Sequence, residues 1–156
     1  MSAHILKPPT VISIPGGRKS VFLAGSIEMG TVEDWQTILT HNLSHLPITI
    51  INPRRDEWDS SWVQDISNPT FKTQVEWELD GQDAADVIAM YLHPDTKAPI
   101  SLLELGLYAP SGKMIVCCPE GFYRRGNVQI VCARFGIELV DSIDELTQRV
   151  IEKLQA

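Results

Sequence analysis

The segments Asp86-Val-Ile-Ala-Met-Tyr-Leu92 and Pro99-Ile-Ser-Leu-Leu-Glu-Leu-Gly-Leu-Tyr-Ala109 follow each other closely in the chain. The first is a short apolar run, which is typical of a strand buried on both faces of a parallel sheet. The second has the length of a helix and carries proline in its first turn, where helices tolerate it. Together they predict one strand-and-helix unit of a parallel sheet.

The same alternation continues on both sides of these segments. The expected strands are residues 20–26, 48–51, 86–92, 113–118 and 137–140, and the expected helices are residues 31–46, 71–84, 100–109 and 142–154. Because strands that alternate with helices form right-handed crossovers, an α/β, doubly wound, five-stranded parallel sheet with helices on both faces is predicted. Residues 20–156 are expected to form this single domain. Residues 1–19, rich in proline and glycine, are expected to form an irregular N-terminal arm.

The composition indicates which classes of binding partner are compatible with the chain. The net charge of the 156 residues is -7, which argues against nucleic acid and membrane surfaces because both attract clustered Lys and Arg. A small-molecule ligand is compatible with this charge. The three cysteines cannot all pair, so reduced thiols are expected. The first residues lack the features of an export signal, and no apolar run is long enough for a membrane span, so the expected compartment is the cytoplasm.

Parallel sheets bind ligands beyond the carboxyl ends of their strands. The helix expected at residues 100–109 follows such an end and is apolar almost all round, except for a stripe that contains Ser101, Glu104 and Tyr108. In one interpretation this stripe meets solvent and Glu104 has no function. In the other, Glu104 lies at the rim of a pocket, where partial burial tunes its pKa and orients it as a nucleophile or base.

These segments resemble the core of the nucleoside 2-deoxyribosyltransferase family. The resemblance is carried by residues 85–92, by Pro94-Asp95, by residues 101–113, and upstream by Phe22-Leu-Ala-Gly-Ser26 and Glu78-Leu-Asp-Gly81. It covers about residues 20–118 and implies a flavodoxin-like or Rossmann-like fold. The segments FLAGSI, NPRRDEW and QxxWE are closer to the transferase-like branch of the family.

The resemblance implies that Glu104 attacks the anomeric carbon of a nucleoside or nucleotide. Loss of the base passes through an oxocarbenium-like state, which a carboxylate can trap as a glycosyl-enzyme, as in retaining glycosidases. Glu78 or Asp95 is expected to supply the proton for the leaving base. The family's aspartate six residues before the nucleophile is replaced here by Ala98. The family also completes each site with an asparagine from a neighbouring subunit, so a homo-oligomer is expected, with Asn127 as that asparagine.

Other candidates follow the expected strands. The expected substrate-binding residues are Gly25, Ser26, Asn52, Arg54, Arg55, Trp58, His93, Ser101 and Asn127. Gly25 and Ser26 leave room for backbone N–H groups to approach a sugar or phosphate, although a tight structural turn is the commoner reason for a glycine. Arg54 and Arg55 would hold a 5′-phosphate as a fork, unless Arg55 only pairs with the acidic residues that follow it.

Aromatic and basic residues suggest further roles. One of Trp58, Trp62 and Trp77 is expected to stack on a nucleobase, and tryptophans of this segment also offer anchors for the oligomer interface. His93 has no second His or Cys at a metal-ligand spacing, so neither a metal nor another cofactor is expected. Residues 124–127 are interpreted as a short basic turn that binds one phosphate or a partner chain.

Three functions compete. The leading hypothesis is cleavage of an N-glycosidic bond, with transfer of the (deoxy)ribosyl group to another base or to water. The second is a nucleotide-binding module without turnover, which the replacement at Ala98 favours. The third is an NAD-cleaving hydrolase, in which the two arginines would face a pyrophosphate.

Overall fold

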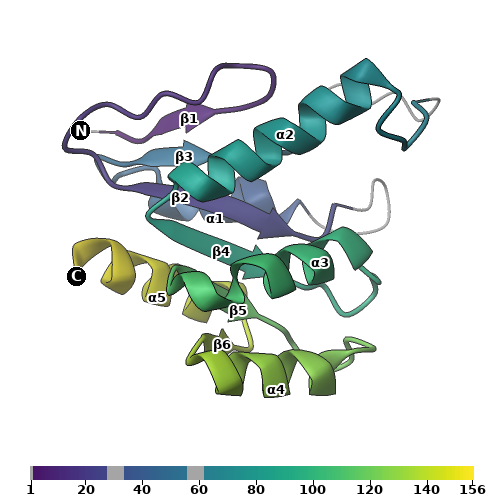
Figure 1. Cartoon of the computed structure of the whole chain (residues 1–156). Coiled ribbons are helices and arrows are strands. Elements are labelled where there is room, and N and C mark those ends of the chain that lie inside the picture. Colours follow the sequence, from purple (N-terminus) through teal and green to yellow (C-terminus); the bar gives the residue numbers. More distant parts are fainter. Residues whose placement is uncertain (1, 28–33, 56–61) are drawn as a thin grey trace.

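The computed structural model of the chain describes residues 2–27, 34–55 and 62–156 (Figure 1). Within these ranges one sheet of six parallel strands has the order β1-β3-β2-β4-β5-β6. The strands are β1 (His4–Leu6), β2 (Ser20–Gly25), β3 (Thr49–Ile51), β4 (Val87–Tyr91), β5 (Met114–Cys117) and β6 (Glu138–Val140).

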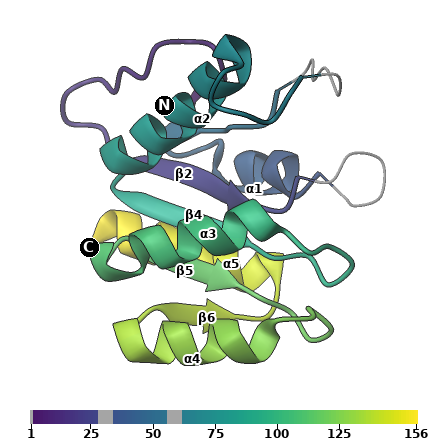
Figure 2. The same ribbon diagram turned by 45° about the vertical axis from the view of Figure 1, so that its right-hand side comes forward.

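Helices cover both faces of this sheet (Figure 2). One face carries α2 (Pro69–Ala84), α3 (Pro99–Tyr108) and α4 (Arg125–Phe135), and the other carries α1 (Trp35–Leu43) and α5 (Ile143–Gln155). A short 3-10 helix, η1 (Ala109–Ser111), follows α3 directly. The predicted doubly wound α/β arrangement is therefore confirmed. No helix in the described ranges combines the length and the hydropathy needed to cross a bilayer.

Two hydrophobic clusters fill the spaces between the sheet and the two helix layers. Along β2, Phe22 and Ala24 belong to the cluster under α2, α3 and α4, whereas Val21 and Leu23 belong to the cluster over α1 and α5. Successive side chains of a strand point to opposite faces. Since both faces are covered, the central strands need apolar residues at every position, which explains the uninterrupted apolar runs.

The sheet has one strand more than the five that the sequence predicts. The additional strand, β1, lies in the arm expected to be irregular and pairs in parallel with β3 at the edge of the sheet. Of its three residues only Leu6 is buried. An edge strand of this length is held by backbone hydrogen bonds on one side, so it has no hydrophobic pattern that the sequence could reveal.

The helix α4 was also not predicted. Residues 124–127, interpreted as a short basic turn, instead lead into this helix and form its first residues. Only Val128 and Cys132 of α4 are buried, which is too weak an apolar stripe to indicate a helix. The helix expected at residues 31–46 is shorter than predicted, because α1 begins after Asp34, whose side chain caps its first turn by accepting from the Thr37 N–H.

The direction of the crossovers reverses between β2 and β4. The chain moves through α1 from β2 to β3 on one side, and through α3 from β4 to β5 on the other. Such a reversal opens a crevice at the carboxyl ends of the strands. Gly25 lies at this point with a φ of +132°, and a Cβ atom there would lie 2.2 Å from the Tyr91 carbonyl oxygen. Any side chain at position 25 would push β2 and β4 apart.

Candidate active site

The polar stripe of α3 faces α2 and not solvent. Ser101, Glu104 and Tyr108 are all buried, and Glu104 is only 8% exposed. The Tyr108 hydroxyl lies 2.9 Å from Oδ1 of Asp83 and 3.2 Å from the Leu79 carbonyl oxygen, both on α2. The interpretation of Glu104 as a solvated surface residue is therefore wrong.

A second polar stripe, on α2, meets Glu104. Gln74, Glu78 and Gln82 are spaced by four residues, so they share one face of the helix. Nε2 of Gln82 donates to Oε2 of Glu104 over 2.7 Å, and Nε2 of Gln74 donates to Oε2 of Glu78 over 3.3 Å. The two carboxyls thus each accept a hydrogen bond from a glutamine on α2.

Both carboxyls resist ionisation. Burial raises the pKa of Glu104 to about 7, and the hydrogen bond from Gln82 offsets part of this rise. Burial also raises the pKa of Glu78 to about 7, with a further contribution from the negative charge of Glu104 and a partial offset by Gln74. With both pKa values near neutrality, one carboxyl can be protonated while the other is ionised, which provides an acid and a base in one site.

The residues after β3 join this network. Arg55 donates from Nη1 to Oε1 of Gln74 over 2.8 Å, and its guanidinium lies 5.1 Å from the centre of the Trp62 ring. Because Gln74 also donates to Glu78, it links the Arg55 guanidinium to the carboxyl pair. Gln82 completes the link, since its Nε2 donates both to the Glu78 carbonyl oxygen and to Oε2 of Glu104. The predicted residues Arg55, Glu78 and Glu104 therefore belong to one connected set of hydrogen bonds.

Arg54 has different partners. Its Nη1 donates to Oε1 of the buried Gln36 over 3.3 Å and lies 3.6 Å from Oδ1 of Asp34. The backbone N–H of Arg54 donates to Oδ1 of Asn52, which is itself buried. The side chain of Asn52 thus shapes the turn that follows β3.

At the carboxyl ends of β2 and β4, Ser26 connects two loops. Its Oγ lies 2.7 Å from Oγ1 of Thr96 and accepts from the backbone N–H of His93 over 3.0 Å. The indole N–H of Trp35 donates to the Ser26 carbonyl oxygen. The hydroxyl of Ser26, expected to bind substrate, is thus engaged in fixing the loop that leads from β4 to α3.

Asp95 lies on that loop and is exposed. Its backbone N–H donates to Nδ1 of the half-buried His93 over 3.0 Å. Among the contacts of the described residues, none joins Asp95 to Glu104. Ala98, the residue directly before α3, is buried and left-handed with a φ of 45°, and its side chain provides no cap.

The tryptophans are divided between the core and the loops. Trp77 is buried in the cluster under α2, and its indole N–H donates to the Thr10 carbonyl oxygen over 2.7 Å. This burial makes Trp77 a core residue and not an interface anchor. Trp62 is half-buried beneath Arg55. Trp58 lies outside the described residues.

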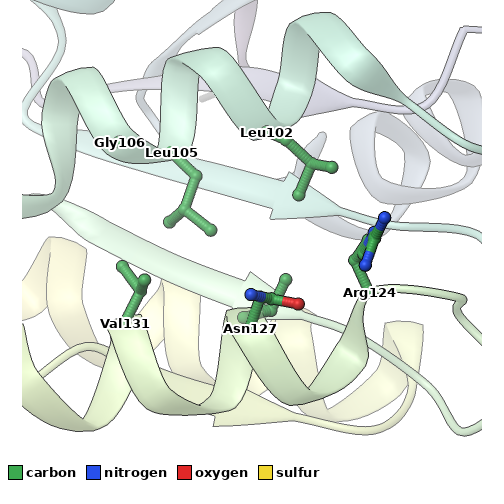
Figure 3. Close-up of a pocket in the computed structure, with 7 residues that line it drawn as sticks. Leu102, Leu105, Gly106, Arg124, Asn127 and Val131 are labelled. Carbon is green, nitrogen blue, oxygen red and sulfur yellow. The ribbon is translucent and has the colours of Figure 1, made fainter.

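Asn127 lies in a separate hollow between α3 and α4 (Figure 3). This hollow has a volume of about 300 Å³, and its lining residues are Leu102, Leu105, Gly106, Arg124, Asn127, Val128 and Val131. Positions 102 and 106 lie on the side of α3 opposite Glu104, because two residues along a helix correspond to roughly half a turn. Within one chain, the structure does not bring Asn127 to Glu104.

Sequence reasoning missed Gln74 and Gln82. The available signal was the spacing Gln-x3-Glu-x3-Gln on the helix expected at residues 71–84, which puts both glutamines on the face of Glu78. In the described ranges, no three His, Cys, Asp or Glu side chains are grouped as a metal site requires.

Comparison with models of protein families gives a match that spans most of this site. Residues 18–122 match the model of a family described as nucleoside 2-deoxyribosyltransferase like. The matched range is more than half of the chain and includes β2 to β5 and the facing stripes of α2 and α3. A search of curated proteins found no match.

Proposed function

Since the chain belongs to the nucleoside 2-deoxyribosyltransferase-like family, we propose that it cleaves the N-glycosidic bond of a nucleoside or nucleotide with Glu104 as the nucleophile. The observation that carries this proposal is a pair of carboxyls on facing helices, the buried Glu104 and the half-buried Glu78, each with a pKa raised to about 7. A reaction that needs a nucleophile and a proton donor at neutral pH suits such a pair.

The proposed reaction has two steps. Ionised Glu104 attacks C1′, the bond from C1′ to the base nitrogen breaks, and its electron pair leaves with the base. Protonated Glu78 donates a proton to that nitrogen. The incoming base or water then attacks C1′ and gives a proton to Glu78, while the bond between C1′ and Glu104 breaks. Both carboxyls regain their starting protonation states, and the (deoxy)ribosyl group has passed to a base or to water.

Glu78 is preferred to Asp95 as the proton donor. Its raised pKa keeps a proton available near neutral pH, and it lies beside Glu104. Asp95 is exposed on the loop after β4. For substrate binding, we assign the sugar to Gly25, Ser26 and His93 at the carboxyl ends of β2 and β4.

The remaining expected binding residues keep their roles in this proposal. After β3, Asn52, Arg54 and Arg55 would face a 5′-phosphate. Ser101 would lie beside the nucleophile on α3, and Trp58 would stack on the base. Asn127 would act on the Glu104 of a neighbouring subunit, because it lies across α3 from Glu104 of its own chain.

One observation favours a second candidate, a nucleotide-binding module without turnover. Ala98 stands where the resemblance implies an aspartate. It is buried, its backbone is left-handed, and its methyl side chain offers no polar group. If that aspartate is indispensable for the chemistry, the chain retains the pocket and loses the reaction.

Replacement of Glu104 by Gln tests the proposal. The protein is incubated with a panel of nucleosides, 5′-nucleotides and NAD, and free base is measured by chromatography. We expect Glu104→Gln to lower turnover by several orders of magnitude while ligand affinity persists, because the attacking oxygen is lost and the shape is kept. A 2-fluoro-substituted substrate should add one glycosyl unit to the wild-type peptide that contains Glu104.

Glu152→Gln on α5 is the matched control, because Glu152 is an exposed glutamate in a helix far from the carboxyl pair in sequence. This variant should keep wild-type turnover. Near-normal turnover by Glu104→Gln, or a label on another peptide, would contradict the catalytic assignment. Binding without release of base from any member of the panel would leave the binding module as the function, and release of nicotinamide alone would identify an NAD-cleaving hydrolase.

A further inference from the structure

Gln82 on α2 contacts the nucleophile that the proposed function assigns. Its side chain is 0% exposed, and its Nε2 donates to Oε2 of Glu104 over 2.7 Å. We infer that Gln82 is a positioning residue, whose amide nitrogen holds Oε2 of Glu104 and leaves Oε1 to attack C1′. This inference rests on the proposed function. It assigns a role to Gln82, a residue that the proposed reaction does not use.

Two acceptors determine which end of the Gln82 amide faces Glu104. Nε2 donates to Oε2 of Glu104 and also, over 3.2 Å, to the carbonyl oxygen of Glu78 one turn earlier. If the amide were reversed, its oxygen would meet these two oxygens, and neither contact would contain a donor. The nitrogen is therefore the end that meets an ionised Glu104.

The other end of the amide argues against a purely structural role. Oε1 of Gln82 is buried and has no hydrogen-bond partner in the described structure. A buried acceptor without a partner lowers stability, and an apolar side chain of the same length would avoid this loss. Oε1 of Gln82 therefore lowers the stability of the fold, while Nε2 of the same amide holds Glu104.

The backbone of Gln82 is also fixed. Nζ of Lys113, in the turn before β5, donates to its carbonyl oxygen over 3.2 Å. The titratable groups that surround the contact are Glu78, Asp80 and Asp83 on α2, Tyr108 on α3 and Lys113. Burial opposes ionisation of Glu104, so the hydrogen bond from Gln82 acts in the opposite direction and favours the attacking form.

The test compares wild type with Gln82→Met in the full chain, which removes the donor and keeps the length of the side chain. The pKa of Glu104 is followed by carbon NMR of the glutamate carboxyls, assigned with Glu104→Gln. We expect this pKa to rise by roughly one to two units, as befits the loss of a hydrogen bond to an ionised group. For any substrate of the panel that wild type turns over, kcat should fall by roughly tenfold to hundredfold with KM changed less than about threefold.

The pH profile separates positioning from general damage. The acidic limb of kcat/KM should move to higher pH by the same amount as the NMR titration of Glu104, since both report the same proton. Gln148→Met is the matched control, because Gln148 makes the same kind of contact on the surface of α5, from Nε2 to Oε1 of Glu152 over 3.1 Å. This control should leave the pKa of Glu104, kcat and the pH profile unchanged.

An unchanged Glu104 titration in Gln82→Met would overturn the inference, and so would wild-type kcat with an unmoved acidic limb. If wild type turns over no substrate of the panel, the proposed function fails, and the attack role of Oε1 fails with it. The NMR titration needs no turnover, so it still reports whether Gln82 controls the charge of Glu104. The two failures are therefore distinguishable.

Wild-type protein provides a measurement that does not depend on the folding of a Gln82 variant. The side-chain N–H resonances of Gln82 should shift with pH at the midpoint of the Glu104 titration, because the nitrogen donates to that carboxyl. This shift should disappear in Glu104→Gln. If the Gln82 side-chain resonances do not shift at the midpoint of the Glu104 titration, the inference is overturned.

Discussion

Glu78 and Glu104 place two ionisable groups where the fold disfavours charge. Burial raises the pKa of each carboxyl from an ordinary 4.5 to about 7, and Glu78 also experiences the charge of Glu104. The folded chain therefore binds these protons more tightly than the unfolded chain does. The stabilising contribution is complete below a pH of about 4.5 and is lost as the pH rises through about 7.

Glu78→Gln should remove much of this pH dependence. Between about pH 5 and about pH 8, the free energy of unfolding of wild type should fall by roughly 2 to 3 kcal/mol more than that of the variant, since one pKa unit corresponds to about 1.4 kcal/mol. Above neutral pH the variant should be the more stable protein. Urea denaturation at several pH values measures both effects. Glu152→Gln, which changes an exposed carboxyl, should follow wild type, and parallel curves for wild type and Glu78→Gln would contradict the prediction.

Arg54 and Arg55 provide a second prediction at this scale. If they hold a 5′-phosphate, replacing either by Ala should lower kcat/KM for a 5′-nucleotide by roughly tenfold to hundredfold more than for the bare nucleoside, because a charge-assisted bidentate contact contributes about 1.5 to 3 kcal/mol. Arg55→Ala should also lower nucleoside turnover to some extent, since Arg55 donates to Gln74 beside Glu78. Arg149→Ala on α5 is the control. Equal losses for the two substrate types would remove the phosphate assignment.

At the scale of elements, the carboxyl end of α2 depends on a residue from the turn before β5. Nζ of Lys113 donates to the carbonyl oxygens of Gln82 and Asp83 over 3.2 and 2.8 Å. The last carbonyl groups of a helix have no partner within the helix and carry partial negative charge, which a cation compensates.

We therefore expect Lys113→Met to lower the free energy of unfolding by roughly 0.5 to 1.5 kcal/mol, measured by urea denaturation with an unchanged m value. Lys72→Met is the matched control, because the Lys72 ammonium pairs with the exposed Glu76 in the second turn of the same helix. A loss no larger than that of the control would show that the cap at Lys113 adds nothing.

The elements differ in how well the sequence reveals them. The five strands expected from apolar runs all form. β2 to β5 are buried on both faces, which favours apolar residues at nearly every position, whereas the edge strand β6 buries only Val140. β1 and α4 were missed for the opposite reason. β1 buries only Leu6, and α4 buries only Val128 and Cys132, so each has too few buried apolar residues for the sequence to reveal it.

The residues of the candidate site also differ in how well the sequence reveals them. Glu104 and Glu78 were expected from motifs in the sequence, and each motif lies on one helix. The roles of Gln74 and Gln82 depend on α2 packing against α3, and the spacing within α2 does not reveal which helix it faces. Ser26 was expected to bind substrate, but only the position of Thr96 explains how its hydroxyl is used.

At the scale of the whole molecule, the two faces of the sheet differ in polarity and use. Figure 2 shows α1 and α5 on one face of the sheet and α2, α3 and α4 on the other. The layer of α1 and α5 is packed on an apolar cluster, whereas the other layer also carries the carboxyl pair and the hollow at Asn127. The outward side of α3 is apolar as well. Ile100, Leu103 and Leu107 are each more than half exposed and follow one another at helical spacing.

This exposed stripe on α3 is where we expect a second copy of the chain to bind. Exposed apolar patches mark interaction sites, and a homo-oligomer is implied by the resemblance, in which Asn127 of one subunit serves the Glu104 of another. Light scattering should therefore give a mass of two or more chains at micromolar concentration. Leu103→Glu should shift the protein toward monomer and lower turnover, whereas Ile66→Glu, at an equally exposed apolar residue outside α3, should do neither. A strict monomer in wild type would contradict the oligomer, and an unchanged mass in Leu103→Glu would place the interface elsewhere.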